Sequence, residues 1–387
     1  MTILNIASKS ILGYCLMSLF SGFYARKLKA SIIIMLVWTL VISKAIYSDS
    51  RTTVRSLYIP LADHYAAIVA FEKYRGQMVH ANFQIHQMKN WDLLRAYYLA
   101  GNAEMAFVMS PLAMDMYLTK PEFRWVGLMH RDGNALAVNR QISNRLNLEK
   151  ERIHRKPNEQ LAKVLREIYE ETGRSVEIGM PHLLSTHSVV LYNYLKERGL
   201  DISFKVHEHK EVQALAIAPP RSPAFLKAND SRLQAAAFEQ SLPWADVVET
   251  EGYGHIAWYS KDVLPWKHGH VECIALATDK IINSNPQAIK EVMDYIKLAG
   301  QDIERAREVG GDQLNEIVSI IRKHIPAHTE KAIKASLDPN LRVINYHNLN
   351  IDKEGIKLIM DLGVEGGVLK APINIEEFAA PRFNTNK

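Results

Sequence analysis

Segments with the pattern of β-strands alternate with helical segments along most of this chain, and no other feature restricts its fold as strongly. The first unit runs from an apolar, β-rich segment at 55–60, through a polar turn at 61–64, into a helical segment that ends near Gly76. Strand, loop and helix in this order open an α/β domain, in which helices pack against a sheet. The sequence therefore predicts an α/β protein.

The same alternation continues along the chain. Asn90 and Asn158 are expected to cap two of the intervening helices, a turn and a helix are expected between 211 and 227, and the pattern from Pro286 onward is mainly helical. At 387 residues the chain is long enough for two domains, and two α/β lobes joined by more than one crossing fit this order. The further strands are expected at Phe83–Met88, Met105–Met109, Trp125–His130, Ala135–Val138, Val176–Met180, Phe204–His207, His255–Tyr259 and Val271–Ala277.

The first 48 residues have the pattern of an export segment. They hold five cations and no acid, and three of those cations lie directly before an apolar run at 30–43. That run has the length of a signal-peptide core and is short for a membrane-spanning helix, which needs about 20 apolar residues. Ala45 and Ser48 are small enough to suit a cleavage site, whereas an uncleaved segment would anchor the protein. We expect an exported protein whose residues 1–48 are a signal peptide or a membrane anchor.

The rest of the chain is electrically balanced, which excludes some classes of partner. The whole chain carries a net charge of +5, but without the five cations of residues 1–48 it has 42 cations and 42 acids. No basic patch for nucleic acid is therefore expected. Cys273 is the one cysteine beyond residue 48, so no internal disulfide is expected there. Phosphate-loop, dinucleotide-binding, nucleophile-elbow and zinc-protease motifs are absent from the sequence, and we expect neither an enzyme nor a bound cofactor.

A hydroxyl-rich turn, Ser185–Ser188, opens a helical segment that Gly199 ends. Serine and threonine cap helices well because their oxygens accept the free amides of the first turn. The same amides attract polar or anionic groups, and His187 lies where a ligand would meet the helix end. An ordinary capped surface helix is the alternative explanation of this stretch.

Four further residues combine a polar or aromatic side chain with a place at the edge of a predicted element. Asp63 and His64 lie where a strand end meets a helix, which is the usual ligand crevice of an open α/β sheet. Trp91 begins a helix, where an indole is poorly placed for the core and can stack on a ligand, or else cover the rim of the core. Asn134 follows Gly133 and could bond a ligand or simply form the turn.

A histidine-rich stretch raises the question of a metal ion. If the segment is extended, His268, His270 and Glu272 lie on one face, because strand side chains alternate. Such a set could bind a metal. A polar, exposed strand explains the spacing as well, and the expected site contains no metal ligand.

Taken together and in order, several segments resemble one family. The chain resembles the nitrate/sulfonate/bicarbonate class of ABC-importer substrate-binding proteins, which includes taurine- and thiamine-precursor-like members, and it is most similar to the nitrate- and bicarbonate-binding branch. The likeness covers most of residues 55–385. The segments that carry it are Leu57–Asp63, Trp91–Arg95, Gly101–Ala106, Ser110–Met114, Asp132–Leu136, Ser185–Leu195, Pro219–Pro220, Leu242–Trp244, Asp262–Pro265 and Ile359–Lys370.

The resemblance implies a bilobed periplasmic-binding-protein fold of the second topological type. Two α/β lobes enclose a ligand cleft and close on the ligand by a hinge motion. The first lobe is then expected at 49–138 plus 263–387, and the second lobe at 139–262. In that branch, the pocket is built from positions that match Trp91, Asn134 and His187, with the loops that contain Asp63, His64, Pro220 and Trp244 nearby.

One departure from the branch bears on the ligand. The branch usually has an acid directly before the Pro-Trp pair, often with a cation close by, whereas this chain has Leu242 there and its nearest acid is Glu239. A buried anion needs a charged or hydrogen-bonding partner. The missing acid argues against nitrate and bicarbonate, and a neutral or aromatic-bearing organic solute is at least as good a candidate.

The resemblance implies a periplasmic solute-binding protein that delivers a small molecule to a membrane permease and its ATPase. A ligand sensor, tethered to the membrane or periplasmic, is one alternative. The other alternative is an enzyme on the same fold, similar to those that make the pyrimidine precursor of thiamine. Those enzymes need a cysteine-rich stretch, which this chain lacks.

Overall fold

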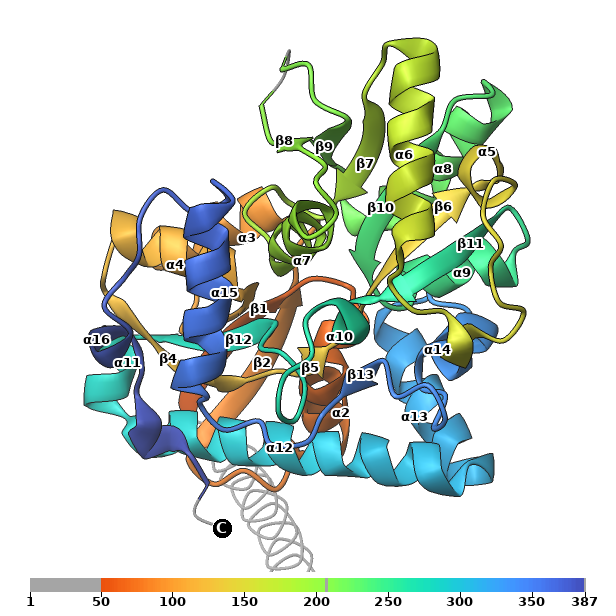
Figure 1. The fold of residues 1–387 in the computed structure, drawn as a ribbon. Helices are drawn as coiled ribbons and strands as arrows, with labels where there is room; N and C mark the ends of the chain where they lie inside the picture. The colour runs from red at the N-terminus through yellow and green to blue at the C-terminus, as the bar shows by residue number, and fades with distance from the viewer. Residues whose placement is uncertain (1–49, 206–207, 386–387) are drawn as a thin grey trace, which may run out of the picture. The chain divides into compact units, whose positions relative to one another are not determined.

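The computed structural model describes residues 50–205 and 208–385, and two main sheets organise them (Figure 1). The first sheet has five strands in the order β2-β1-β3-β12-β4. β1, β2 and β3 run parallel, and β12 runs antiparallel to both β3 and β4. The strands are β1 (Thr52–Tyr58), β2 (Ala81–Gln87), β3 (Met105–Met109), β4 (Phe123–Leu128) and β12 (Cys273–Thr278).

We call this sheet and its helices the first lobe. β3 is buried along its whole length, as expected for an apolar run in the centre of a sheet. The side chain of Asn90 accepts the amide of Leu93 and so caps α3, as the sequence predicts. The helices of this lobe are η1 (Ala62–His64), α2 (Tyr65–Tyr74), α3 (Trp91–Leu99), α4 (Ser110–Thr119), α11 (Asp279–Ser284), α12 (Pro286–Val309) and α13 (Gly311–His324).

The second sheet has six strands in the order β11-β6-β10-β7-β9-β8. β6 runs antiparallel to β10 and β11, and the remaining neighbours run parallel. With its helices this sheet forms the second lobe. The strands are β6 (Asn134–Asn139), β7 (Val176–Met180), β8 (Ile202–Ser203), β9 (Val212–Ala216), β10 (Ala236–Ser241) and β11 (Gly254–Tyr259).

Helix ends in the second lobe follow the capping signals of the sequence. Asn158 accepts an amide at the start of α6, and Gly173 ends that helix in the left-handed conformation that glycine favours. Ser185 accepts the amide of Ser188 at the start of α7. The helices of this lobe are α5 (Arg140–Ser143), η2 (Arg152–His154), α6 (Glu159–Thr172), α7 (Thr186–Lys196), η3 (Pro219–Arg221), α8 (Ser222–Ser231), α9 (Trp244–Thr250) and α10 (Ser260–Val263).

The chain crosses between the lobes twice, which confirms the expectation of more than one crossing. The first crossing contains β5 (Arg131–Asp132), between β4 and β6, and the second runs from α10 to β12. β5 pairs with β13 (Ile344–Asn345) in a small two-stranded sheet. Late segments of the chain therefore stabilise the first crossing.

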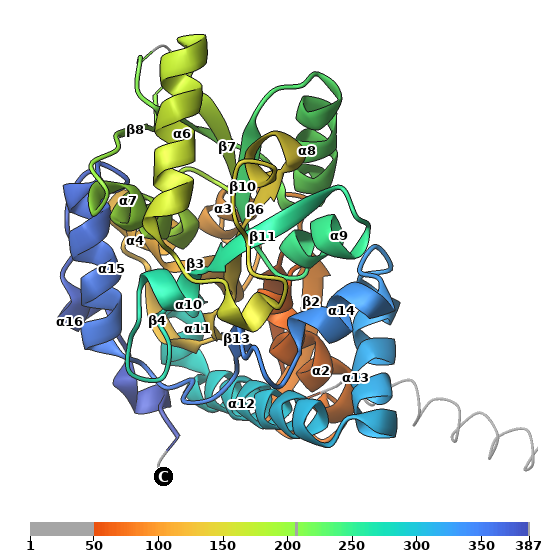
Figure 2. The ribbon, with the colours of Figure 1, turned by 45° about the vertical axis from the view of Figure 1, so that its right-hand side comes forward.

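The C-terminal helices touch both lobes. α15 (Lys353–Glu365) packs against α4 of the first lobe and α7 of the second, and both ribbon views show it alongside them (Figures 1 and 2). Lys196 of α7 forms an ion pair with Glu365 of α15. α14 (Glu330–Ser336) packs against α9 of the second lobe. Two short helices, α16 (Ile375–Phe378) and η4 (Pro381–Phe383), complete the described chain.

The structure confirms the α/β class and corrects several predicted elements. β6 pairs in the second sheet, so residues 134–138 are wrongly assigned to the first lobe by the sequence. Val212–Ala216, expected in a turn and helix, is strand β9, and strand β10 has no counterpart among the predicted strands. The expected strand at 204–207 lies partly outside the described residues, and the strand that precedes it is β8.

The export segment predicted at 1–48 lies outside the described residues. The described elements belong to the compact unit Arg51–Lys387. Within the described residues, none of the helices combines the length and the hydropathy that a membrane-spanning helix requires.

Candidate functional site

Polar side chains from several strand ends meet at one edge of the first sheet. β1, β3 and β4 end at this edge, and the antiparallel β12 begins there. Asp63 follows β1, His130 follows β4, and Glu272 and Cys273 lie at the start of β12. Open α/β sheets bind ligands outside the carboxyl ends of their strands, so this edge is the candidate site.

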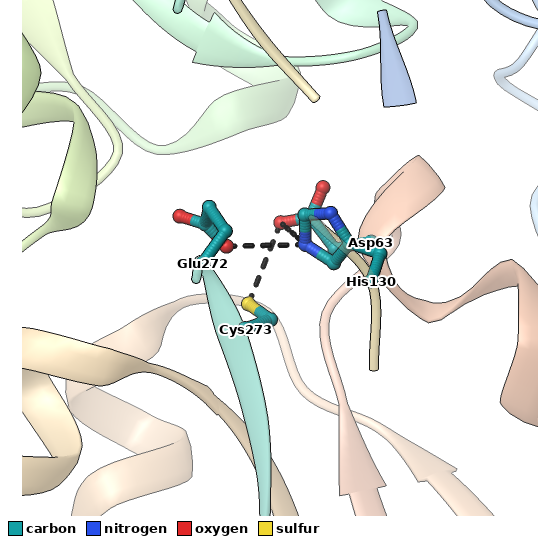
Figure 3. A group of neighbouring side chains, drawn as sticks. All are labelled: Asp63, His130, Glu272 and Cys273. Carbon is teal, nitrogen blue, oxygen red and sulfur yellow. Dashed lines mark hydrogen bonds and ion pairs between the residues drawn. The ribbon is translucent and has the colours of Figure 1, made fainter. Parts of the chain in front are cut away.

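Asp63, His130, Glu272 and Cys273 form a compact group that we call the junction cluster (Figure 3). One nitrogen, oxygen or sulfur atom from each side chain lies within 4.8 Å of the others, and all four residues are buried. His130 Nε2 is 3.1 Å from Glu272 Oε2 and 3.6 Å from Asp63 Oδ2. The Cys273 thiol donates to Asp63 Oδ2 at 3.5 Å. The first lobe thus supplies the whole cluster.

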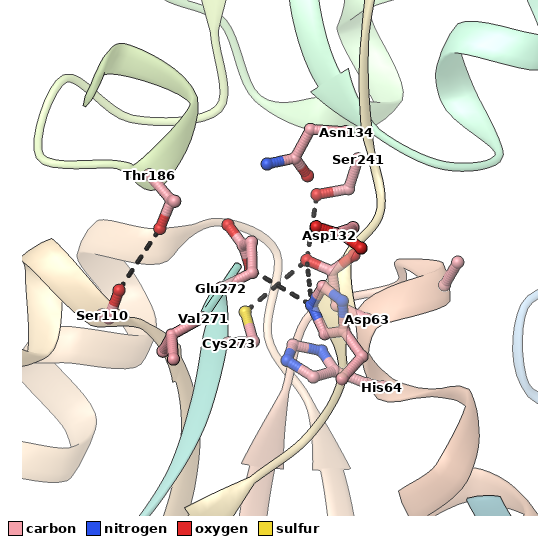
Figure 4. A network of polar contacts seen from close by, with 12 residues as sticks. Asp63, His64, Ser110, Asp132, Asn134, Thr186, Ser241, Val271, Glu272 and Cys273 are labelled. Carbon is pink, nitrogen blue, oxygen red and sulfur yellow. Dashed lines mark hydrogen bonds and ion pairs between the residues drawn. The ribbon is translucent and has the colours of Figure 1, made fainter. Parts of the chain in front are cut away.

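The second lobe brings polar side chains toward this cluster, and Figure 4 shows two of them, Ser241 and Asn134. Ser241, the last residue of β10, donates to Asp63 Oδ2 at 2.9 Å. His187, in the first turn of α7, has Nε2 3.1 Å from Ser241 Oγ. Asn134 begins β6 and is the sheet partner of Ser241, beside which it lies in Figure 4. The candidate site therefore combines side chains from both lobes.

A buried ion pair lies at the centre of the junction cluster. Burial opposes a charge on His130, but the Asp63 and Glu272 carboxylates outweigh burial and raise the pKa of His130 to about 10. Burial likewise opposes the charge on Asp63, yet His130 holds the pKa of this carboxyl down to about 2. At neutral pH His130 is therefore protonated and Asp63 is ionised.

The hydrogen bonds determine which nitrogen of His187 carries the proton. The ionised Asp63 can only accept, so Ser241 directs its hydroxyl proton to Asp63, and Ser241 Oγ accepts from His187 Nε2. Burial lowers the pKa of His187 to about 4, so the ring is neutral and Nδ1 has no proton. His187 Nδ1 lies 3.6 Å from Glu272 Oε1, and neither atom has a hydrogen-bond partner among the described residues. Two acceptors therefore face each other without a donor.

Further buried polar atoms without a partner surround this pair. Burial, with the nearby Glu272, raises the pKa of Glu239 well above its ordinary value and so favours the neutral form of this acid. Leaving a buried polar group unpaired costs about 1–3 kcal/mol, and native proteins rarely tolerate many such groups. The buried atoms without a hydrogen-bond partner among the described residues include Asp63 Oδ1, His64 Nε2, Trp91 Nε1, His130 Nδ1, both polar side-chain atoms of Asn134, both carboxyl oxygens of Glu239 and Gln240 Oε1.

The structure places Trp91 and His64 together beneath the edge of the first sheet. Trp91 is 1% exposed, so the expectation that its position disfavours core burial is wrong. Its ring packs edge-on against His64 with a centroid distance of 6.0 Å. Burial lowers the pKa of His64 to about 4, and its Nδ1 contacts the backbone of Ile59. Trp91 Nε1 and His64 Nε2 have no hydrogen-bond partner among the residues that the structure describes.

Two other predicted site residues have different surroundings. Pro220 is exposed on η3, and no hydrogen bond of a described residue joins its segment to the junction cluster. Trp244 is buried, donates from Nε1 to the backbone oxygen of Pro60 at 3.1 Å, and packs edge-on against His328. Trp244 therefore links the two lobes through a loop of each.

Leu242 also links the lobes, through its main chain. Its amide donates to the carbonyl of Gly133 at 3.0 Å, and its carbonyl accepts from the amide of Ala62 at 2.8 Å. The side chain is fully buried and apolar. Leu242 thus puts an apolar side chain where the resembled branch has an acid. The nearest acid in the sequence, Glu239, lies buried in β10.

The histidine-rich stretch does not form the extended face that a metal site would require. His268 has a positive φ of 72° in a turn, and β12 begins only at Cys273. His270 Nε2 contacts Ser260 Oγ at 3.0 Å. Glu272 is the single member of the predicted set that belongs to the junction cluster.

Sequence reasoning missed His130, Ser241 and Cys273 as site residues. His130 lies just after β4, Ser241 ends β10 and Cys273 begins β12, whereas Asp63 lies in η1, the short helix that follows β1. His130 ends a predicted strand. Because ligands bind outside the carboxyl ends of the strands in open α/β sheets, His130 is a candidate for the same reason as Asp63. Ser241 had no such signal, because strand β10 itself was missed.

Comparisons with known proteins agree with this architecture. A family model described as the NMT1-like family matches residues 49–310, which is more than half of the chain. No curated protein matches the sequence significantly.

Solved structures share the fold at low sequence identity. The periplasmic nitrate-binding protein NrtA from Synechocystis PCC 6803 has a TM-score of 0.69 at 15% identity, over 86% of this chain and 87% of its own. A ligand-binding component of an ABC-type import system from Staphylococcus aureus, with zinc bound, has a TM-score of 0.65 at 18% identity. The match covers 86% of this chain and 98% of the other. The alkanesulfonate-binding protein SsuA from Xanthomonas axonopodis pv. citri, bound to MOPS, has a TM-score of 0.62 at 11% identity. This match covers 86% of this chain and 99% of SsuA. The predicted bilobed periplasmic-binding-protein fold is confirmed.

Proposed function

Because the chain belongs to the NMT1-like family, we propose that it is the solute-binding component of an ABC importer. It captures a small molecule at the junction of its two lobes and delivers it to a membrane permease and its ATPase. The fold supports this proposal, since the similar solved structures include nitrate- and alkanesulfonate-binding proteins. The raised pKa of the buried Cys273 thiol also makes this residue a poor nucleophile, in keeping with a binding role.

One observation carries the choice of solute: His187 Nδ1 and Glu272 Oε1 lie 3.6 Å apart, and neither atom has a hydrogen-bond partner among the described residues. A solute that presents N–H or O–H groups, or a positive charge, supplies what this pair lacks. An oxyanion would instead meet the carboxylates of Asp63 and Glu272. The hydrogen bonds and ion pairs of these two carboxylates include no lysine or arginine among the described residues.

The neighbouring arginine is already engaged elsewhere. Arg131 directs its guanidinium to Asp352 at 2.9 Å and to the carbonyl of Asn348. It is therefore not free to neutralise an anion at the junction. The proposed solute is a small donor-bearing or cationic organic molecule, with Trp91 and Asn134 as further candidate contacts.

The direct test identifies the solute that co-purifies with the native protein, by mass spectrometry, and then measures its affinity for the metal-free protein by calorimetry. We expect His187→Ala and Asn134→Ala each to weaken binding by about 5- to 150-fold, the effect of losing 1–3 kcal/mol of hydrogen bonding. Asn193→Ala is the matched control, because Asn193 lies on the same helix and contacts Glu197 at an exposed site. Unchanged affinity in both site variants would refute the proposed pocket.

A second arm tests the charge of the solute. We expect that nitrate, bicarbonate and methanesulfonate do not raise the melting temperature of the protein. We expect that at least one solute with an amine, amide or amidine group does raise it. Stabilisation by the oxyanions alone would contradict the proposal.

We also infer that the protein acts in the periplasm and that residues 1–48 direct its export. The charge and apolar pattern of this segment supports the inference. Mass spectrometry of the mature N-terminus separates a cleaved signal peptide from a retained membrane anchor. A retained anchor would favour the tethered-sensor alternative.

A further inference from the structure

The junction cluster contains the donor types of a transition-metal site. Imidazole, thiolate and carboxylate ligands together are typical of Zn²⁺ and of related divalent ions, whereas Mg²⁺ and Ca²⁺ prefer oxygen ligands. His130, Cys273, Asp63 and Glu272 supply one nitrogen, one sulfur and two carboxylate groups, all buried. Neither the family match nor the solute proposal requires this combination.

The spacing of the four groups fits a single ion. In a tetrahedral zinc site with metal–ligand bonds of about 2.0–2.3 Å, neighbouring ligand atoms lie about 3.3–3.6 Å apart. His130 Nε2 is 3.1 Å from Glu272 Oε2 and 3.6 Å from Asp63 Oδ2, and Cys273 Sγ is 3.5 Å from Asp63 Oδ2. These three pairs are close to tetrahedral spacing, and all four donors lie within 4.8 Å of one another.

The position of the ligands on the fold also suits a rigid site. Asp63 follows β1, His130 follows β4, and Glu272 and Cys273 are consecutive at β12, so three segments of one sheet hold the four donors (Figure 3). Ser241 donates to Asp63 from the second lobe, as an outer-shell partner of a metal-binding carboxylate does. Asp63 Oδ1 and His130 Nδ1 are buried and have no hydrogen-bond partner in the described part of the chain, and Glu272 Oε1 faces His187 Nδ1 at 3.6 Å.

We propose that Asp63, His130, Glu272 and Cys273 bind one divalent transition-metal ion of the zinc type at the base of the lobe junction. Binding requires a neutral imidazole and a thiolate, so the protons of His130 and Cys273 pass to solvent when the ion enters. The site belongs to the first lobe alone and does not depend on transport or on the identity of the solute.

The experiment uses full-length purified protein that has been stripped with a chelator and desalted. We expect one Zn²⁺ per chain by elemental analysis after incubation and desalting, and no retention of Mg²⁺ or Ca²⁺. With Co²⁺ we expect a thiolate-to-metal absorption band in the near ultraviolet, which reports Cys273 directly. Folded wild-type protein that retains no Zn²⁺, or that binds Co²⁺ without this band, would overturn the proposal.

Variants test the individual ligands. Cys273→Ser is expected to abolish the Co²⁺ thiolate band, and both Cys273→Ser and His130→Gln are expected to weaken Zn²⁺ binding at least tenfold. His268→Asn is the matched control, since His268 is exposed in the same histidine-rich stretch and its backbone conformation suits asparagine. Wild-type affinity in either ligand variant would refute the four-donor site. If a variant does not fold, the Co²⁺ band of the wild type decides the question.

Discussion

The ion pair between His130 and Asp63 is the most strongly constrained feature at the scale of single residues. Both side chains are fully buried, and each holds the other in its charged form. Removing one partner of a buried pair leaves an uncompensated charge and typically costs about 3–5 kcal/mol. A residue pair of this kind ties the stability of the fold to the protonation state of its binding site.

The first prediction concerns the pH dependence of stability in metal-free protein. The pKa of His130 rises from 6.5 to about 10 on folding, so its contribution is fully present below pH 6.5 and is lost as the pH rises toward 10. We expect the wild type to lose more free energy of unfolding between pH 7 and pH 10 than His130→Gln does. Urea titrations at several pH values measure this difference.

The control for this prediction is His255→Gln, which removes an exposed histidine from β11. It should keep the pH profile of the wild type. Parallel profiles for the wild type and His130→Gln would show that His130 does not carry the proton at neutral pH.

At the scale of secondary-structure elements, the sequence predicts the strands whose flanks carry clear signals. Met105–Met109 is bounded by polar residues and a Ser-Pro helix start, and it is strand β3 as expected. β10 was missed because Glu239, Gln240 and Ser241 make its second half polar. In the folded protein these three side chains are buried at the lobe junction, where the tertiary structure, not local propensity, decides their environment.

The site could be predicted only in part, for the same reason. Asp63, Asn134 and His187 lie at strand or helix ends that the local pattern reveals. His130 also ends a predicted strand, but only the antiparallel insertion of β12 between β3 and β4 brings it, with Glu272 and Cys273, to Asp63. That pairing joins segments about 140 or more residues apart in the chain, and no local rule encodes it.

The second prediction concerns the edge strand β11. A Cβ atom at Gly254 would lie 2.5 Å from the carbonyl oxygen of Val138 and 2.5 Å from Val248 Cγ1. Neither the β6 backbone nor the packed α9 side chain can move away easily, so Gly254→Ala is expected to destabilise the protein by about 1–3 kcal/mol. Urea unfolding measures the change.

Gly76→Ala is the matched control, because a Cβ atom there meets nothing within 4 Å. It is expected to change the stability by less than about 0.5 kcal/mol. Equal stability of the two variants would mean that the β11–β6 contact relaxes more easily than the structure indicates.

At the scale of the whole described unit, the lobes are held together by many dispersed contacts. Ser110 and Thr186 have their hydroxyl oxygens 3.4 Å apart across the junction, and α15 packs against a helix of each lobe. Opening the lobes must therefore break hydrogen bonds and slide α15 against at least one partner, in addition to any bending at the two crossings. A solute that binds both lobes favours the closed arrangement by its differential affinity.

The third prediction uses Trp244 to shift this balance. Trp244→Phe keeps an aromatic ring beside His328 but removes the hydrogen bond to Pro60, worth about 1 kcal/mol. We expect a larger radius of gyration for the solute-free variant in small-angle scattering and about fivefold weaker solute binding. A variant with a wild-type radius and affinity would show that this bond does not hold the lobes together.

The main-chain link at Leu242 has a consequence for how such a protein can diversify. Its amide and carbonyl, not its side chain, connect the turn at Gly133 with the loop at Ala62. Every amino acid except proline offers the same two groups. The main-chain link between the lobes therefore survives a change of side chain at this position, as long as the new side chain fits the buried space that Leu242 fills.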